Sequence, residues 1–186
     1  MKTETTSQQP GTASGKTGTV YWFTGLAGAG KTTLGRLFYA RLRQNRPNVL
    51  FLDGDVLREV FGHPAAHTLE ERRALAMQYA RLCRMLSDQG LDVVIATISL
   101  FHEVQEWNRK HLGAYREIFV RAPLEVLLER DQKQLYSRAR RGEISQVMGV
   151  DLPVEEPRNP DLILDNDGRR PPEALVELTL ATFKLQ

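Results

Sequence analysis

A short segment near the N-terminus has the residue types and spacing that bind phosphate groups. Residues 25–32 read Gly-Leu-Ala-Gly-Ala-Gly-Lys-Thr and fit the pattern G-x-x-x-x-G-K-[ST]. Glycines allow the backbone to wrap so that successive N–H groups point at phosphate oxygens. The ammonium of Lys31 suits the β- and γ-phosphates of ATP, and the hydroxyl of Thr32 suits Mg²⁺. We expect the nucleotide to lie along Gly25, Leu26, Ala27, Gly28, Ala29, Gly30, Lys31, Thr32 and Thr33.

Two carboxylates follow the next apolar run of the chain. Asp53 and Asp55 come directly after the run at 48–52, and Arg58 follows them. Beside a phosphate loop, one carboxylate can hold magnesium while the other accepts the proton of an attacking hydroxyl, and the arginine can bind an anionic acceptor. The alternative interpretation is an acidic turn that caps the next helix. We favour the catalytic interpretation, with Asp53 at the magnesium, Asp53 or Asp55 as the base, and Lys31 stabilising the transferred charge.

A basic stretch lies further along the chain. Residues 132–141 include Lys133, Arg138, Arg140 and Arg141, with Arg130 just before them. A basic helix is often only a solvated face. A phosphotransferase, however, has to exclude water and neutralise charge on the moving phosphoryl group, and a basic flap over the site does both. The stretch is therefore predicted to form a basic lid.

The segments around these motifs alternate between strand and helix patterns. Apolar, β-favouring runs predict strands at 20–24, 48–52, 91–98, 117–120 and 162–164. Helices are expected from the phosphate loop to Pro47, from the capping box at 68–71 to residue 90, at 104–112, after Pro123, at 134–141 and from 171–172 onward. This alternation predicts an α/β fold with a mainly parallel sheet and with ligand sites beyond the carboxyl ends of its strands.

Length and composition narrow the function classes. The 186 residues suit one domain, which we place at 19–186, after a disordered tail at 1–18 that is rich in Thr, Ser, Gly and Gln. The 25 basic and 23 acidic residues nearly balance, so no nucleic-acid partner is expected. No apolar run is long enough to cross a membrane, so no membrane partner is expected either. The single cysteine, Cys83, fits a cytoplasmic location and lies on an apolar helical stripe, which predicts a packing role.

Several motifs occur together in one order. The phosphate loop is followed by Asp53-Gly54-Asp55-x-x-Arg58, Ile98-Ser99, Arg130-Asp131-x-Lys133-x-Leu135-Tyr136, Gly142-Glu143-Ile144 and Glu156-Pro157-x-Asn159-Pro160-Asp161. This pattern, which runs from about residue 20 to residue 165, resembles the adenylylsulfate (APS) kinase family. The resemblance implies a P-loop kinase fold, in which helices flank a mainly parallel five-stranded sheet and a basic lid covers the site, and usually a homodimer. It also implies that Mg-ATP phosphorylates the ribose 3′-hydroxyl of a small nucleotide acceptor, adenosine 5′-phosphosulfate, to give PAPS and ADP.

The resemblance further implies roles for individual residues. Ser99 matches a serine that is sometimes designated a phosphoserine intermediate in the family, although direct in-line transfer needs none. Arg130 is expected at the nucleotide, and Arg58 and Arg72 match acceptor-binding arginines. The implied acceptor site comprises Asp55, Arg58, His67, Arg72, Ile98, Ser99, Phe101 and Lys133.

Departures from the family pattern gather in the acceptor half. They are His67 for phenylalanine, Leu75 for asparagine, Met77 and Gln78 for two arginines, Leu100 and His102 for proline and arginine, and Ser145 and Val147 for lysine and phenylalanine. Losing a base-stacking ring or an amide removes ~1–3 kcal/mol each. The first expectation for the acceptor is APS, and the alternative is a cytidine diphosphate derivative carrying a phosphoramidate, the substrate of a family branch in capsule modification. A second alternative is a non-catalytic nucleotide-binding module, which would need neither Asp53 nor Asp55.

Overall fold

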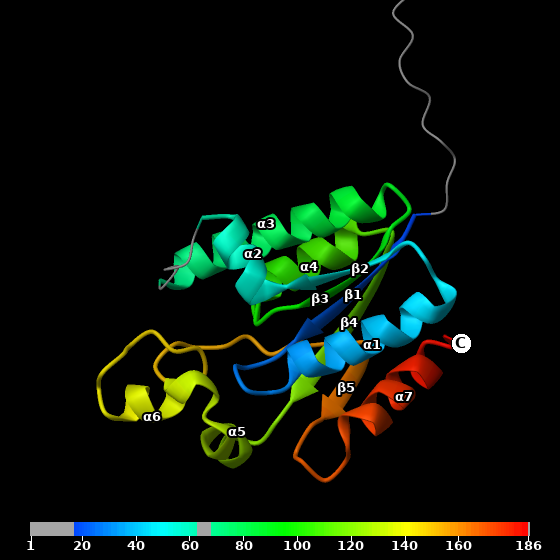
Figure 1. Ribbon diagram of the computed structural model, residues 1–186. Helices are drawn as coiled ribbons and strands as arrows, with labels where there is room; N and C mark the ends of the chain where they lie inside the picture. Colours follow the sequence, from blue (N-terminus) through cyan, green and yellow to red (C-terminus); the bar gives the residue numbers. More distant parts are fainter. Residues whose placement is uncertain (1–16, 63–67, 186) are drawn as a thin grey trace, which may run out of the picture.

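A parallel five-stranded sheet forms the middle layer of the protein (Figure 1). The computed structural model describes residues 17–62 and 68–185. The strands are β1 Thr19–Thr24, β2 Val49–Asp53, β3 Asp92–Ala96, β4 Ala114–Arg121 and β5 Leu162–Asp165, in the spatial order β2-β3-β1-β4-β5. Each pair of neighbouring strands is parallel, so the predicted α/β fold with a mainly parallel sheet is confirmed.

Helices cover both faces of this sheet (Figure 1). Helices α1 Lys31–Asn45 and α7 Pro172–Thr182 pack on one face, and α3 Leu69–Ser87 and α4 His102–His111 pack on the other. The shorter elements lie beyond the carboxyl ends of the strands; they are α2 Gly54–Val60, α5 Leu124–Arg130, the 3₁₀ turn Gln132–Gln134 and α6 Leu135–Arg140. The predicted lid therefore consists of a 3₁₀ turn followed by a short helix.

Alternate side chains of β1 enter two separate cores. Val20 and Trp22 pack under α3 and α4, whereas Tyr21 and Phe23 pack under α1 and α7. All four are at most 2% exposed. A strand that is buried on both faces is apolar along its whole length, which is why the run could be recognised in the sequence. Cys83 is fully buried in the first core, where burial raises the pKa of its thiol, in agreement with a packing role.

The structure shifts some of the predicted boundaries. No sequence pattern places a helix at 54–60, because Val56 and Val60 are exposed and α2 has no continuous apolar stripe. The strand predicted at 91–98 ends at Ala96, since the chain turns away there and Ser99 takes a positive φ of 29°. The tail predicted at 1–18 lies outside the described residues except for its last two, and the Gly18 N–H donates to the Ser87 carbonyl at 2.8 Å.

The parallel topology brings the chemical residues to one edge of the sheet. The phosphate loop follows β1, Asp53 ends β2, Ser99 follows β3 and Asn166 follows β5. The carboxyl ends of parallel strands meet at the same edge, so these segments converge although they are far apart in sequence. Among the described residues, no helix combines the length and the apolar character that crossing a membrane requires.

A buried ion pair fixes the segment that returns from the lid to β5. Glu117 on β4 is 1% exposed and accepts from the Arg109 guanidinium of α4 at 2.7 Å. Arg109 also donates to the Asn159 carbonyl and lies 3.5 Å from Asp161, while the Glu117 N–H donates to Asp161 at 2.8 Å. Burial raises the pKa of Glu117, and the charge of Arg109 only partly offsets this effect. The pair therefore holds the strand, the helix and the returning segment in one arrangement.

Replacing Arg109 should destabilise the fold, because the buried Glu117 carboxylate then has no counter-charge. We expect Arg109→Met to lower the free energy of unfolding by about 2–4 kcal/mol, because Glu117 loses its counter-charge, with some relief because Arg109 is partly exposed. The raised pKa means that the folded state binds a proton more readily than the unfolded state, so the loss should shrink as the pH falls from 8 towards 5. Urea titrations at both pH values measure it.

A matched control uses an arginine whose ion pair is exposed. Arg158 pairs with Glu106 at 3.4 Å, and both side chains are more than half exposed. Arg158→Met should cost at most about 0.5 kcal/mol. Equal losses in the two variants would contradict a structural role for the buried pair.

Candidate active site

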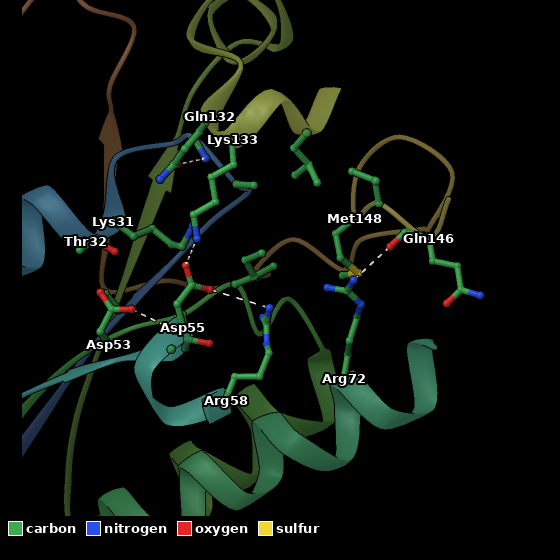
Figure 2. Close-up of a pocket in the computed structure, with 18 of the residues that line it drawn as sticks. Lys31, Thr32, Asp53, Asp55, Arg58, Arg72, Gln132, Lys133, Gln146 and Met148 are labelled. Carbon is green, nitrogen blue, oxygen red and sulfur yellow. Dashed lines mark hydrogen bonds and ion pairs between the residues drawn. The ribbon is translucent and has the colours of Figure 1, made fainter. Parts of the chain in front are cut away.

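Many of the predicted site residues line a cavity of about 460 Å³ at the carboxyl edge of the sheet (Figure 2). A smaller chamber of about 30 Å³ adjoins it, and the two share the lining residues Arg58, Arg72, Thr97, Ile98 and Met148. The predicted residues that line the larger cavity are Ala27, Gly28, Lys31, Thr32, Asp53, Asp55, Arg58, Arg72, Ile98 and Lys133. Those that line the smaller chamber are Arg58, Arg72, Ile98, Ser99 and Phe101.

The phosphate loop has the backbone that its glycines permit. Gly28 and Gly30 take positive φ values of 76° and 98°. A Cβ at Gly30 would lie 2.4 Å from the side-chain nitrogen of Asn166, which donates to the Ala29 carbonyl at 2.8 Å. Arg130 supports the same loop by donating to the Gly28 carbonyl at 3.1 Å and the Asn166 carbonyl at 3.0 Å. These contacts hold the loop in shape at its side away from the cavity.

Lys31 places a buried ammonium inside the cavity. Its side chain runs along the loop and donates to the Leu26 carbonyl at 2.7 Å. Burial lowers the pKa of Lys31 to about 8, although the charges of Asp55 and Asp53 oppose this change. A buried ammonium that donates one hydrogen bond among the described residues, to Leu26, keeps further donors for phosphate oxygens.

The two carboxylates after β2 have different partners. Asp53 is the N-cap of α2, where one of its side-chain oxygens accepts from the Asp55 N–H at 2.9 Å. The capping interpretation is thus correct for Asp53, but the same side chain also lines the cavity. Asp55 accepts from Lys133 at 3.0 Å and lies 3.8 Å from Arg58. Burial raises the pKa of Asp55, but the hydrogen bond and charge of Lys133, with Arg58 and Lys31, outweigh it and lower the pKa.

The lid lies across the cavity from these carboxylates. Gln132, Lys133, Leu135 and Arg138 line the cavity, whereas Arg141 pairs with Glu143 on the outside. Figure 2 shows Lys133 reaching towards Asp55 close to the end of Lys31. Of the basic side chains in the lid, Lys133 and Arg138 therefore line the cavity, whereas Arg140 and Arg141 do not.

Arginines form the wall between the larger cavity and the smaller chamber. Arg58 and Arg72 line both, and Figure 2 shows them rising from α2 and α3 towards the cavity. Arg72 donates to the Gln146 carbonyl at 3.1 Å, and burial lowers its pKa. Ser99 is 5% exposed, and its hydroxyl lies 2.8 Å from that of Thr97. Two guanidinium groups at this end suit an acceptor that carries linked anionic groups.

Several predicted residues do not line either cavity. Gly25, Leu26, Ala29, Gly30, Thr33 and Arg130 form or support the phosphate loop instead. His67 lies outside the described residues. Of the departures from the family pattern, Leu75, Ser145 and Val147 line a cavity, whereas Met77, Gln78, Leu100 and His102 do not. Among the described residues, the departures that can change the shape of the site directly are therefore Leu75, Ser145 and Val147.

Sequence reasoning missed four residues with contacts at the site. Asn166 supports the phosphate loop, and its position after the last strand was the one signal that could have found it. Thr97 bonds to Ser99, Gln132 accepts from the Gly28 N–H at 3.1 Å, and Met148 lines both cavities. Gln132 lies within the predicted lid, but it is uncharged, and no motif singles out Thr97 or Met148. The contacts of all three depend on how distant loops pack.

The cavity contains oxygen donors of the kind that Mg²⁺ prefers. Thr32 contributes a hydroxyl and Asp53 a carboxylate. Within the described residues, no cluster of three or more His, Cys, Asp or Glu side chains could hold a metal ion by itself. This donor set fits an ion that takes most of its ligands from water and from nucleotide phosphates.

Comparison with known proteins agrees with this geometry. The family model described as adenylylsulphate kinase matches residues 17–165. The chain belongs to this family. A curated member, the cytidine diphosphoramidate kinase of Campylobacter jejuni, is 41% identical over 166 residues, which cover 89% of this chain and 96% of the relative. The adenylyl-sulfate kinase of Paraburkholderia xenovorans is 39% identical over 165 residues, which cover 88% and 92% of the two chains.

A solved member of the adenylylsulphate kinase family has the same fold. The APS kinase of Mycobacterium tuberculosis, solved in complex with AMPPNP and APS, superposes with a TM-score of 0.83 at 30% identity, covering 90% of this chain and 98% of that one. The named relatives are kinases, so this protein is a phosphotransferase that binds ATP. The predicted P-loop kinase fold is confirmed.

The lowered pKa of Lys31 predicts proton uptake when this kinase binds nucleotide. At pH 8 about half of the Lys31 side chains are neutral in the free enzyme, and a bound phosphate should restore the charge. We expect ADP binding to take up about half a proton at pH 8 and much less at pH 6.5, and affinity to fall as the pH rises above 8. Calorimetry in buffers with different ionisation enthalpies measures the uptake.

The control for this measurement is the other cavity lysine. Lys133 is 73% exposed at its side chain, so Lys133→Met should leave the proton uptake in place. Binding of ADP without any proton uptake at pH 8 would contradict a partly neutral Lys31.

Proposed function

We propose that the protein transfers the γ-phosphoryl group of ATP directly to the ribose 3′-hydroxyl of a nucleotide acceptor. One observation carries this proposal: the phosphate-binding lysine and the two carboxylates line the same cavity, which also reaches two arginines. In this scheme ATP lies along the phosphate loop, with Lys31 on the β- and γ-phosphates. The acceptor lies on the side of Arg58 and Arg72.

Asp55 is the better candidate for the base. One oxygen of Asp53 is engaged as the cap of α2, and its side chain is 12% exposed, whereas the Asp55 side chain is 60% exposed and contacts Lys133 of the lid. Asp55 accepts the proton of the 3′-hydroxyl as the P–O bond to the acceptor forms and the P–O bond between the γ-phosphorus and ADP breaks, so that ADP leaves. Because phosphoryl transfer proceeds through a loose transition state, positioning matters more than base strength, and a carboxylate of lowered pKa is sufficient.

Charge on the transferred group is balanced by the surrounding cations. Lys31 and the lid side chains Lys133 and Arg138 all line the cavity and can approach the equatorial oxygens. Mg²⁺, held by Thr32 and Asp53 together with the nucleotide, would neutralise charge on the β- and γ-phosphates. The lid also excludes water, which would otherwise compete with the acceptor hydroxyl.

In the proposed function, Ser99 supports the acceptor site and does not carry a phosphoryl group. Its buried hydroxyl is paired with Thr97 and lines the smaller chamber but not the larger cavity that contains Lys31. This placement favours direct transfer without a phosphoserine.

The homodimer and the role in capsule modification stay predictions.

For the acceptor, we propose a cytidine 5′-diphosphate derivative that carries a phosphoramidate. The relative from Campylobacter jejuni is named for this substrate. The chamber beside the arginines is walled by Leu75, Phe101 and Met148, so it offers no side-chain amide at those positions and little more space than a few water molecules need. A single pyrimidine ring needs less space and fewer hydrogen-bond partners than a purine. Arg58 and Arg72 suit the linked anionic groups of this acceptor.

APS is the second candidate. The solved relative from Mycobacterium tuberculosis is in complex with APS, and the relative from Paraburkholderia xenovorans is named an adenylyl-sulfate kinase. An adenosine phosphosulfate also carries two linked anionic groups, so the arginines do not separate the two acceptors. The two acceptors differ in their nucleobase, so the residues that contact the nucleobase must distinguish them.

An acceptor screen tests the proposal. Purified protein with Mg-ATP is given cytidine diphosphoramidate, APS or CDP, and ADP release is followed together with ³¹P NMR of the product. We expect kcat/KM for cytidine diphosphoramidate to exceed that for APS by about tenfold or more, which corresponds to about 1.4 kcal/mol of discrimination. The new phosphorus signal should be that of a ribose 3′-phosphomonoester.

Asp55→Asn provides the control for the catalytic role. It should lower kcat by about 10²-fold or more and leave ADP affinity within about threefold, because the carboxylate contacts the acceptor side.

Two results of the acceptor screen would contradict the proposal. A higher kcat/KM with APS than with cytidine diphosphoramidate would make APS the acceptor, as first expected. ADP binding without turnover of any acceptor would favour the nucleotide-binding module.

A further inference from the structure

One lid side chain occupies a hydrogen-bond donor of the phosphate loop. The side-chain oxygen of Gln132 accepts from the Gly28 N–H at 3.1 Å. Gly28 belongs to the loop whose amides bind nucleotide phosphates, and both residues line the larger cavity. The Gln132 oxygen thus uses an amide of the kind that binds phosphate oxygens in phosphate loops.

The next residue, Lys133, contacts a carboxylate on the opposite side of the cavity. The ammonium of Lys133 donates to the Asp55 carboxylate at 3.0 Å. Figure 2 shows Gln132 and Lys133 together on the lid side of the cavity, with Asp53 and Asp55 across from them. Two consecutive side chains thus engage the donor half and the acceptor half at once.

The backbone that carries both side chains is in an uncommon conformation. Asp131, Lys133 and Gln134 have positive φ values of 31°, 57° and 55°, in a region that non-glycine residues adopt only when neighbours hold them there. The Asp131 carboxylate accepts from the Tyr136 and Ser137 N–H groups at 2.9 and 3.1 Å, which fixes the start of α6. The Gln132 carbonyl accepts from the Leu135 N–H, but within residues 17–62 and 68–185 the side chains of Gln132 and Lys133 form hydrogen bonds only with Gly28 and Asp55. The turn is therefore held partly by contacts that substrates can replace.

We propose that Gln132 competes with the nucleotide phosphate for the Gly28 amide and that its displacement releases Lys133 from Asp55. Gln132 is thus a positioning residue that links occupation of the donor site to the state of the acceptor site. Since the two side chains lie on one short turn, the loss of one contact weakens the other. Release of Lys133 leaves the Asp55 carboxylate free to accept a hydrogen bond from the acceptor hydroxyl, and in this respect the inference rests on the proposed function.

The competition itself is testable without any acceptor. ADP affinity is measured by calorimetry for the wild type and for Gln132→Ala, Gln132→Glu and Gln89→Ala. Gln132→Ala removes the competing oxygen and should tighten ADP binding about two- to tenfold. Gln132→Glu places a negative charge on the same amide and should weaken binding.

Gln89→Ala is the matched control. Gln89 is an exposed glutamine whose side chain makes one hydrogen bond, to the Met85 carbonyl at 3.0 Å, at the far end of α3. Its ADP affinity should equal that of the wild type. Unchanged or weaker binding in Gln132→Ala overturns the competition, because a glutamine that merely supported the loop would help nucleotide binding.

A double-mutant cycle tests whether the two side chains move together. Gln132→Ala is combined with Lys133→Met, and ADP affinity is measured for all four proteins. Any direct contact between Lys133 and ADP cancels in the cycle. Linked release predicts that Gln132→Ala tightens binding less in the Lys133→Met background than in the wild type, and additive effects overturn the link. Both results are independent of which acceptor the kinase uses, so they fail separately from the proposed function.

Discussion

The buried ammonium of Lys31 is the interaction around which the site is arranged. It lies in the phosphate loop, bonds to the Leu26 carbonyl, and is close enough to Asp53 and Asp55 for their charges to affect its pKa. Because burial penalises its charged form, this cation gains most when an anion enters the cavity. The same loop is held from behind by Asn166 and Arg130, so the ammonium meets the phosphate in a fixed geometry. In the proposed function, phosphoryl transfer follows from placing the acceptor across from this charge.

The parallel sheet makes that placement possible. Its strands deliver the phosphate loop, the acidic pair and the segment at 97–99 to one edge, and the lid covers them from the far side. The lid takes an uncommon backbone at Lys133 and Gln134, which costs about 1–2 kcal/mol per residue. Contacts across the cavity offset part of this cost. A turn balanced in this way can exchange its internal contacts for contacts with substrates.

Much of the fold and part of the site could be predicted from local patterns. β1 was recognisable because both of its faces are buried, and the phosphate loop because its glycines and Lys31 stand at fixed spacing. Helix α2 was not, since Val56 and Val60 are exposed and give no stripe. Gln132 and Asn166 were missed because their partners lie more than one hundred residues away in the sequence. Such contacts depend on loop packing, which no short pattern records. The acceptor walls at Leu75 and Val147 were noticed as departures, but their place in the cavity required the structure.

The stereochemistry of transfer tests the central claim most directly. ATP whose γ-phosphorus is made chiral with three oxygen isotopes is turned over with the best acceptor, and the configuration of the product phosphate is determined. A single in-line step between the phosphate loop and the acceptor on Asp55 predicts inversion. Retention would mean two successive transfers, and so a phosphorylated side chain such as Ser99, and would contradict the account.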